Sequence, residues 1–150
     1  MESDPTQLVG PGPACIVASR DEDMRPEIAR GWAPELELQA AIATVCVGSA
    51  RDSRMDSNLR SNGAIAVTMN HPATYHGFQA KGRITEIGEP SAEQLEHVQA
   101  HVAAFAAEVE RVGLSEEQLR RLLVADLISV TFAVHELYDQ TPGPRAGARL

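Results

Sequence analysis

Short apolar runs alternate with polar turns along most of the chain, and they predict six strands. The runs have the length of strands and are bounded by turn residues. Between the second and third runs, Pro34 and the charged residues near Glu35 and Glu37 predict a turn. The predicted strands cover residues 14–20, 26–34, 38–48, 64–69, 78–88 and 126–139.

A short helix is predicted between the third and fourth strands. Ser53 followed by Asp56 has the spacing of an N-terminal capping box. Asn62-Gly63 is a stop signal of the kind found at helix C-termini. We therefore expect a helix over residues 54–61 with Ser53 as its N-cap.

Two further helices are predicted before the last strand. Ser91 and Gln94 form a capping box, and the helix that they open ends at Gly113. A second capping box, Ser115 with Gln118, opens a short helix. The longer helix has one apolar face, because its apolar residues recur every three or four positions: Leu95, Val98, Val102, Phe105, Val109 and Val112.

The order of these elements predicts a mainly β (α+β) fold. Three strands, a short helix, two strands, a helical pair and one strand favour a six-stranded antiparallel barrel packed against helices. Residues 14–139 are expected to form one domain. Residues 1–13 and 140–150 carry several prolines, so we expect a flexible lead-in and an irregular tail.

Composition narrows the function classes. The formal net charge is -8, from 13 basic and 21 acidic residues, which disfavours a nucleic-acid partner but allows a local pocket for a small anion. The sequence shows neither a signal peptide nor an apolar run long enough for a membrane span. Cys15 and Cys46 lie in apolar runs, as buried structural thiols do. A reduced, cytoplasmic, soluble protein is the expectation.

Cations and hydroxyl groups gather at the start of the predicted helix 54–61. Arg51 and Arg54 flank that end, and Ser53 and Ser57 add hydroxyl donors. Free backbone N–H groups and the helix dipole attract anions there, and guanidinium groups suit phosphate oxygens. The pattern favours a phosphate site. The alternative is that the arginines offset neighbouring acidic residues and Ser53 only caps the helix.

A second polar group lies on the predicted strand 78–88. Gln79, Lys81 and Arg83 point to the same face, since side chains alternate along a strand. Gln79 and Lys81 would then hydrogen-bond the carbonyl groups and ring nitrogens of a flat heterocycle. The alternative is an edge strand with a solvated face.

Other candidates are weaker. Arg30 precedes Gly31-Trp32, and glycine lets a ligand approach closely, while Trp32 is expected in the core or at an interface. His97 and His101 are four residues apart on the long helix, the spacing of a metal pair, but they have no matching third ligand. We expect both histidines in solvent, off the apolar stripe, and no metal site. No pattern of a catalytic nucleophile is present, so catalytic residues stay unknown.

Three stretches in this order resemble a known family. They are Arg25-Pro26 after an acidic turn, then "SRMDSNLRSNGAIAVT", then "FQAKGRI". Together they resemble the pyridoxamine 5'-phosphate oxidase-related family of FMN-binding split β-barrels, over roughly residues 14–147. The segment "YDQTPGPRAG" is similar to that of a short-chain subgroup. The resemblance implies a homodimer that holds FMN at the subunit interface.

The resemblance also implies roles for single residues. In the family, an arginine of the second strand and a Ser-Arg-Lys run hold the FMN phosphate, and a glutamine meets the isoalloxazine ring. These roles fall here to Arg30, to Ser53 with Arg54, and to Gln79. Arg30 lies one residue later after the proline than in the oxidase. Met55 replaces the family's lysine, so Arg51 or Lys81 is expected to supply that charge.

The predicted function is that of an FMN-dependent oxidoreductase acting on an unidentified small molecule. The C-terminal Trp and Arg-x-His motif of the true oxidase is absent, which argues against the vitamin B6 reaction. One alternative is a module that binds or senses a flavin, a deazaflavin or haem without turnover. Another is a barrel without cofactor that serves in protein interactions. Trp32, taken as an exposed apolar residue, gives modest support to a homodimer.

Overall fold

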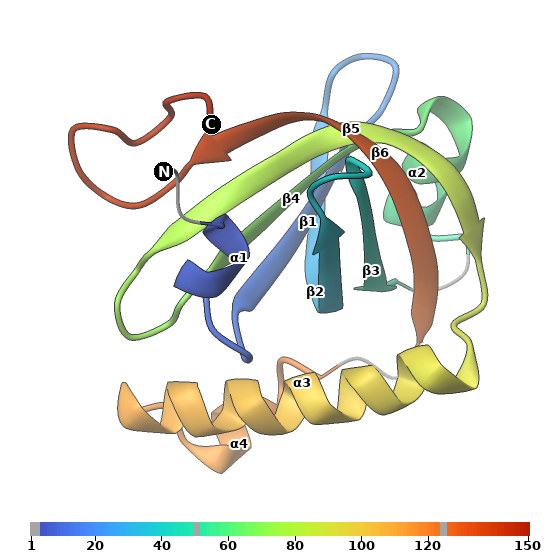
Figure 1. Ribbon diagram of the computed structural model, residues 1–150. Coiled ribbons are helices and arrows are strands. Elements are labelled where there is room, and N and C mark those ends of the chain that lie inside the picture. Colours follow the sequence, from blue (N-terminus) through green and yellow to red (C-terminus); the bar gives the residue numbers. More distant parts are fainter. Residues whose placement is uncertain (1–3, 50–51, 124–125) are drawn as a thin grey trace.

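Six antiparallel strands close into a barrel in the computed structural model, which describes residues 4–49, 52–123 and 126–150 (Figure 1). Around the barrel the order of strands is β1-β2-β3-β6-β5-β4. The predicted mainly β fold is therefore confirmed. The strands are β1 (Ala14–Arg20), β2 (Pro26–Glu37), β3 (Ile42–Gly48), β4 (Ala64–Asn70), β5 (Gly77–Gly88) and β6 (Leu127–Asp139).

The predicted helices are present, with one short helix in addition. The capping signals are realised at α2, where the Ser53 side chain accepts a hydrogen bond from the Asp56 N–H and Gly63 ends the helix with a φ of 68°. Both predicted capping boxes form, at Ser91 and at Ser115. The helices are α1 (Pro5–Leu8), α2 (Arg54–Asn62), α3 (Ala92–Arg111) and α4 (Glu116–Arg120).

The turn predicted at Pro34 is wrong. β2 continues through Glu37, and the chain reverses at residues 38–41, where the Ala41 N–H donates to the Leu38 carbonyl at 3.2 Å. Pro34 lies instead in a bulge, because the register with β3 shifts between Trp32 and Glu35 and Ala33 has a φ of 48°. Proline lacks the N–H that a strand ladder uses, and a bulge is where a strand tolerates it.

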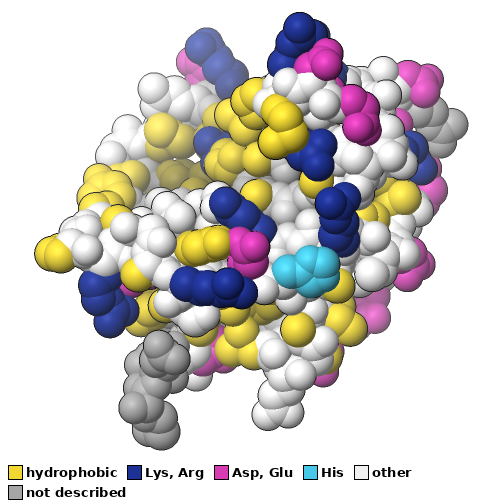
Figure 2. All heavy atoms as spheres, turned by 90° about the horizontal axis from the view of Figure 1, so that it is seen from above, with side chains coloured by type: hydrophobic (Ala, Val, Ile, Leu, Met, Phe, Trp, Pro, Cys, Tyr) yellow, Lys and Arg dark blue, Asp and Glu magenta, His cyan; other side chains and the backbone are white. Residues whose placement is uncertain are grey.

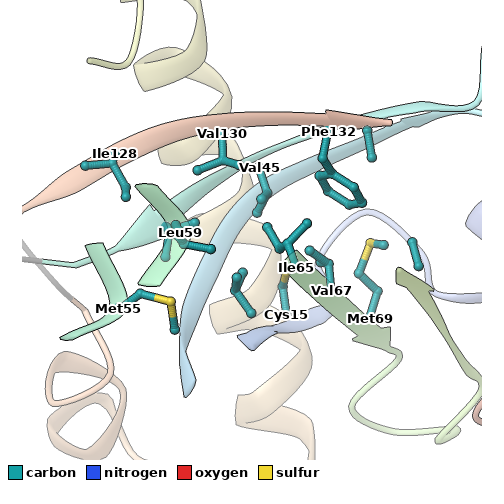
Figure 3. Close-up of a cluster of buried hydrophobic side chains, with 14 of the residues drawn as sticks. Cys15, Val45, Met55, Leu59, Ile65, Val67, Met69, Ile128, Val130 and Phe132 are labelled. Atoms are coloured by element: carbon teal, nitrogen blue, oxygen red, sulfur yellow. The ribbon is translucent and has the colours of Figure 1, made fainter. Parts of the chain in front are cut away.

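Alternate residues of the strands fill the barrel with apolar side chains. β1 shows the pattern most simply, since Cys15 and Val17 are buried while their neighbours are partly exposed. Met55 and Leu59 of α2 join this core from one end of the barrel (Figure 3). The Asn58 amide adds a buried hydrogen bond to the Ser19 hydroxyl at 3.1 Å, so α2 closes that end.

A second apolar cluster lies between the outside of the barrel and α3. Trp32 and Cys46 pack there against Phe105 and Val109 of the predicted apolar face. Trp32 is only 3% exposed, so it belongs to the core, and the support that it lent to a dimer as an exposed residue is wrong. Both cysteines are buried and free, as predicted. Burial raises the pKa of Cys15 to about 12 and that of Cys46 to about 11.

The segments before β1 and after β6 return to the barrel. Val9, which follows α1, is 3% exposed. Residues 140–150 are irregular but turn back, and the Leu150 N–H donates to the Leu137 carbonyl at 2.8 Å. Among the described helices, none has the length and hydropathy that crossing a bilayer requires.

Candidate functional site

The strand register places three of the predicted site residues on one outer face of the barrel. Arg30 of β2 pairs with Ile16, Ile16 pairs with Thr68, Thr68 pairs with Gln79, and Gln79 pairs with Tyr138. Residues that pair across strands point to the same side of a sheet. Arg30 and Gln79 therefore share a row, although 49 positions separate them in the printed sequence.

Lys81 belongs to the adjacent row on the same face. Ala18 pairs with Ala66, Ala66 with Lys81, and Lys81 with Glu136. The two alanines give this part of the face a low, flat floor. The longer charged side chains of Lys81 on β5 and Glu136 on β6 border this floor.

A shallow depression of about 370 Å³ lies over this floor. Figure 2 shows the barrel from above, where Lys and Arg side chains gather with one histidine and an acidic side chain between them. The cations match what a flat anionic ligand requires, and the small alanines let its ring approach. The charged or titratable residues that line the depression are Arg20, Lys81, Arg83, His135 and Glu136.

Noncovalent contacts hold side chains in and beside this depression in place. The Gln79 amide donates to the Thr68 hydroxyl at 2.7 Å. The Arg83 guanidinium donates to the Asn62 carbonyl at 2.7 Å, at the end of α2 where the helix dipole attracts a cation. The Lys81 ammonium lies 5.0 Å from the centre of the Tyr138 ring.

Tyr138 and Glu136 form a hydrogen-bonded pair beside Lys81. The Tyr138 hydroxyl donates to the Glu136 carboxylate. This bond is the main cause that raises the pKa of Tyr138 above its usual value of 10. Sequence reasoning missed Arg20, His135, Glu136 and Tyr138, because only the pairing of β1 and β6 with their neighbours brings them to Lys81.

The residues predicted to hold a phosphate lie elsewhere, at the start of α2. The Ser53 hydroxyl caps the helix and lies 2.6 Å from the Ser49 hydroxyl. The Arg54 side chain is 68% exposed and lies 3.5 Å from Glu27. Ser57 is exposed, and Arg51 lies outside the described residues. These contacts agree with the alternative that Arg54 offsets an acidic neighbour.

The predicted set therefore divides into two groups. The nine residues of α2 span about 13 Å at the usual rise per residue. Ser53 and Arg54 lie at the N-terminal end of α2, whereas Arg83 contacts Asn62 at its C-terminal end.

β5 has a neighbouring strand on each side, so the alternative of an edge strand is wrong. Arg30 is partly buried, with its guanidinium 5.9 Å from the centre of the Phe105 ring.

The prediction that His101 is solvated is wrong. The side chain is 5% exposed, because residue 101 falls between Val98 and Phe105 on the buried face of α3. Burial lowers the pKa of His101. His97 is exposed, as predicted, and lies 2.8 Å from Glu35. Within the described ranges, no three His, Cys, Asp or Glu side chains gather as metal ligands do.

Comparisons with known proteins show the fold. No family model matches the sequence, and no curated protein matches it. Among solved structures, an F420 reductase superposes with a TM-score of 0.60 at 13% identity, over 91% of this chain and 98% of that one. HupZ from Group A Streptococcus gives a TM-score of 0.54 at 17% identity, over 98% and 100%.

A third structure carries the name of the resembled family. It is a protein related to general stress protein 26, of the pyridoxinephosphate oxidase family, from Clostridium acetobutylicum. Its TM-score is 0.52 at 15% identity, over 91% of this chain and 85% of that one. At these identities the likeness is one of fold. The chain has the split-barrel fold of these proteins, as the sequence resemblance predicted.

Proposed function

We propose that this protein binds a flavin-type cofactor, with FMN as the first choice, on the outer face formed by β1, β4, β5 and β6. We further propose that it is an oxidoreductase acting on a small molecule. The observation that carries the proposal is that Gln79 and Lys81 share one outer face of β5, with Lys81 at the edge of the alanine floor and Gln79 opposite Thr68 in the next row. An F420 reductase with the same fold adds support.

The face suits the ring system of such a cofactor. Ala18 and Ala66 present methyl groups to one side of a flat ring. Gln79 offers an amide and Lys81 a positive charge, which together match carbonyl groups and ring nitrogens. A bound flavin supplies hydride chemistry, while the protein contributes orientation and charge. Gln79 would bind and orient the ring, and Lys81 would stabilise negative charge on it.

Two groups of donors are available for the phosphate. Arg20 and Arg83 line the same depression as Lys81, and Arg83 follows Lys81 by two residues on β5, or about 6.6 Å. The other group is Ser53, Arg54 and Ser57 at α2, together with Arg51 as the sequence proposes. An exposed pair such as Arg54 with Glu27 contributes at most about 1 kcal/mol, so a phosphate would displace Glu27 readily. We assign the phosphate to Arg20 and Arg83, and Arg54 is tested beside them.

The same face supports the proposal of a homodimer. Ile28, which pairs with Ala18, is 66% exposed next to the alanine floor. A large apolar side chain beside a binding surface favours cover by a second copy of the chain. The second copy would exclude water from the ring. Arg30, in the row of Gln79, would then reach the cofactor at this interface.

The experiment compares FMN with riboflavin, which lacks the phosphate. Each is titrated into the protein and binding is followed by flavin fluorescence. We expect the Arg83→Ala variant to bind FMN about 10- to 100-fold more weakly and riboflavin unchanged, the loss of a charged hydrogen bond. Arg121→Ala, at the exposed C-cap of α4, is the matched control.

The results separate the possibilities. If Arg54→Ala lowers the affinity for FMN and Arg83→Ala does not, the phosphate lies at α2. If the wild-type protein binds neither flavin, the proposal is wrong. Anaerobic mixing of the FMN-loaded protein with NADPH then tests turnover. Rapid loss of the visible flavin absorbance supports an oxidoreductase, and its persistence favours a module that binds without turnover.

A further inference from the structure

A second cavity, of about 490 Å³, lies at the end of the barrel opposite α2. Its walls are α1, the bulge of β2, the end of β4 and the first half of α3 (Figure 1). The core side chains of Val9, Met69 and Phe78 reach it from inside, and all three are buried. β4 begins directly after α2 and ends at this cavity. One end of the barrel is therefore closed by α2, and the opposite end is open at the cavity.

The bulge of β2 keeps this end open. Because the register shifts between Trp32 and Glu35, the Ala33 N–H is turned toward α3 and donates to His101 Nδ1 at 2.7 Å. His101 Nε2 in turn donates to the Pro13 carbonyl at 2.8 Å. One buried imidazole thus fixes the bulge, α3 and the residues before β1 relative to one another. The cavity is preformed, and both nitrogens of His101 are already used.

The lining determines what the cavity accepts. Most of it is apolar, contributed by Leu36, Met69, Phe78 and the prolines of residues 11–13, and its volume is in the range of small-molecule sites. At the rim, Glu35 and His97 lie 2.8 Å apart and are 62% and 48% exposed, so they can meet a ligand. The Glu35 carboxylate repels anions and attracts hydrogen-bond donors.

We propose that this cavity is a binding site for a small, mainly apolar molecule that is neutral or positively charged and directs a hydrogen-bond donor to Glu35. The site is separate from the flavin face, since Gln79, Lys81 and Arg83 do not line it. The proposal stands whether or not a flavin binds.

Two fluorescent probes with one scaffold test the charge preference. N-phenyl-1-naphthylamine is neutral, apolar and carries an N–H donor, and 8-anilino-1-naphthalenesulfonate adds a negative charge. We expect saturable, one-site binding of the neutral probe to the wild-type protein. The sulfonate should bind at least about tenfold more weakly, and Glu35→Gln should remove most of this difference.

Two alanines of α3 provide a matched pair of variants. Both are exposed and they lie two turns apart, but of the two Ala100 lines the cavity and Ala107 does not. We expect Ala100→Phe to fill the space and weaken the neutral probe at least about tenfold, and Ala107→Phe to leave it unchanged. Ala100→Met, a smaller change, serves if the Phe variant melts at a lower temperature than Ala107→Phe.

Three results would overturn the proposal. The first is the absence of saturable binding of the neutral probe. The second is equal loss of its binding in Ala100→Phe and Ala107→Phe, which would place the probe elsewhere. The third is equal affinity of the wild-type protein for both probes, which would mean that Glu35 does not select by charge.

Discussion

His101 on α3 and Ala33 in the bulge of β2 are joined by a hydrogen bond of 2.7 Å from the Ala33 N–H to the imidazole Nδ1. Since Nδ1 accepts, the imidazole proton resides on Nε2, where it is donated to the Pro13 carbonyl. The bond therefore requires the neutral ring. The Trp32 ring lies 5.4 Å away and reports on this region, because it is the one tryptophan of the sequence.

Replacing His101 should destabilise the protein. His101→Leu keeps the bulk but leaves the Ala33 N–H and the Pro13 carbonyl without partners, at a cost of about 1–3 kcal/mol for each group. Urea denaturation followed by Trp32 fluorescence measures the free energy of unfolding. His97→Leu breaks only the exposed contact with Glu35 and should cost less than about 1 kcal/mol. Equal effects of the two variants would contradict the role of His101.

Acidification should act through the same ring. Burial holds the pKa of His101 in the folded protein below its ordinary value of 6.5, so below pH 6.5 the unfolded chain binds the proton more readily. The stability contributed by the neutral ring is present above pH 6.5. It is lost as the pH falls from 6.5 toward the lowered pKa. The unfolding free energy, measured in urea at several pH values, should fall over this window in the wild-type protein.

The control for this pH dependence is His101→Gln, which cannot titrate. We expect the variant to be less stable at pH 7 but to lose less stability on acidification than the wild-type protein. A fall of the same size in both proteins would assign the pH dependence to other groups.

Gly82 is predicted to be indispensable to the barrel. A Cβ atom at this position would overlap the Ala133 carbonyl on β6, where the register of β5 and β6 shifts. Gly82→Ala should therefore destabilise the protein by at least about 2 kcal/mol, as overpacking against backbone does. Gly88, at the end of the same strand, has nothing within 4 Å of such an atom. Gly88→Ala should be neutral or slightly stabilising, and urea denaturation followed by Trp32 fluorescence measures both variants.

The proposed homodimer is tested at Ile28. Ile28→Glu introduces a charge next to the alanine floor and should convert a dimer into a monomer in light scattering after gel filtration. Val112→Glu, at the end of α3 and 51% exposed in the wild-type protein, should leave the dimer intact. A wild-type protein that is monomeric at micromolar concentration would contradict the proposed interface.

Elements with local signals were predictable from the sequence. The hydroxyl of Ser53, the stop at Gly63 and the capping boxes at Ser91 and Ser115 act within a few residues, and α2, α3 and α4 begin where these signals indicate. The sequence predicts a short last helix that runs through Leu123, but α4 ends at Arg120. The alternation along β5 likewise placed Gln79 and Lys81 on one face. In each case the deciding interaction lies within the segment itself.

Features decided by distant partners were not predictable. Pro34 and the charges after it look like a turn, but Pro34 lies in a bulge whose Ala33 N–H is bound by His101, 68 residues after Ala33. The spacing of His97 and His101 does not reveal that His101 forms a hydrogen bond with the Pro13 carbonyl. The depression at Lys81 required the pairing of β1 and β6 with β4 and β5. His135 and Glu136 of β6 line this depression, and no short stretch of the sequence shows that they lie beside Lys81.

The closed barrel also constrains how the chain folds. β6 completes the ring by pairing with β3, 79 or more residues earlier, and with β5, so neither β3 nor β5 has its full set of backbone hydrogen bonds until residues 127–139 are in place. During synthesis on the ribosome, one edge of β3 and one edge of β5 therefore stay unpaired until β6 is made. Contacts so distant in sequence make folding slow, and exposed strand edges invite association with other chains. Chaperones that shield strand edges would matter most for this protein in the interval before β6 emerges.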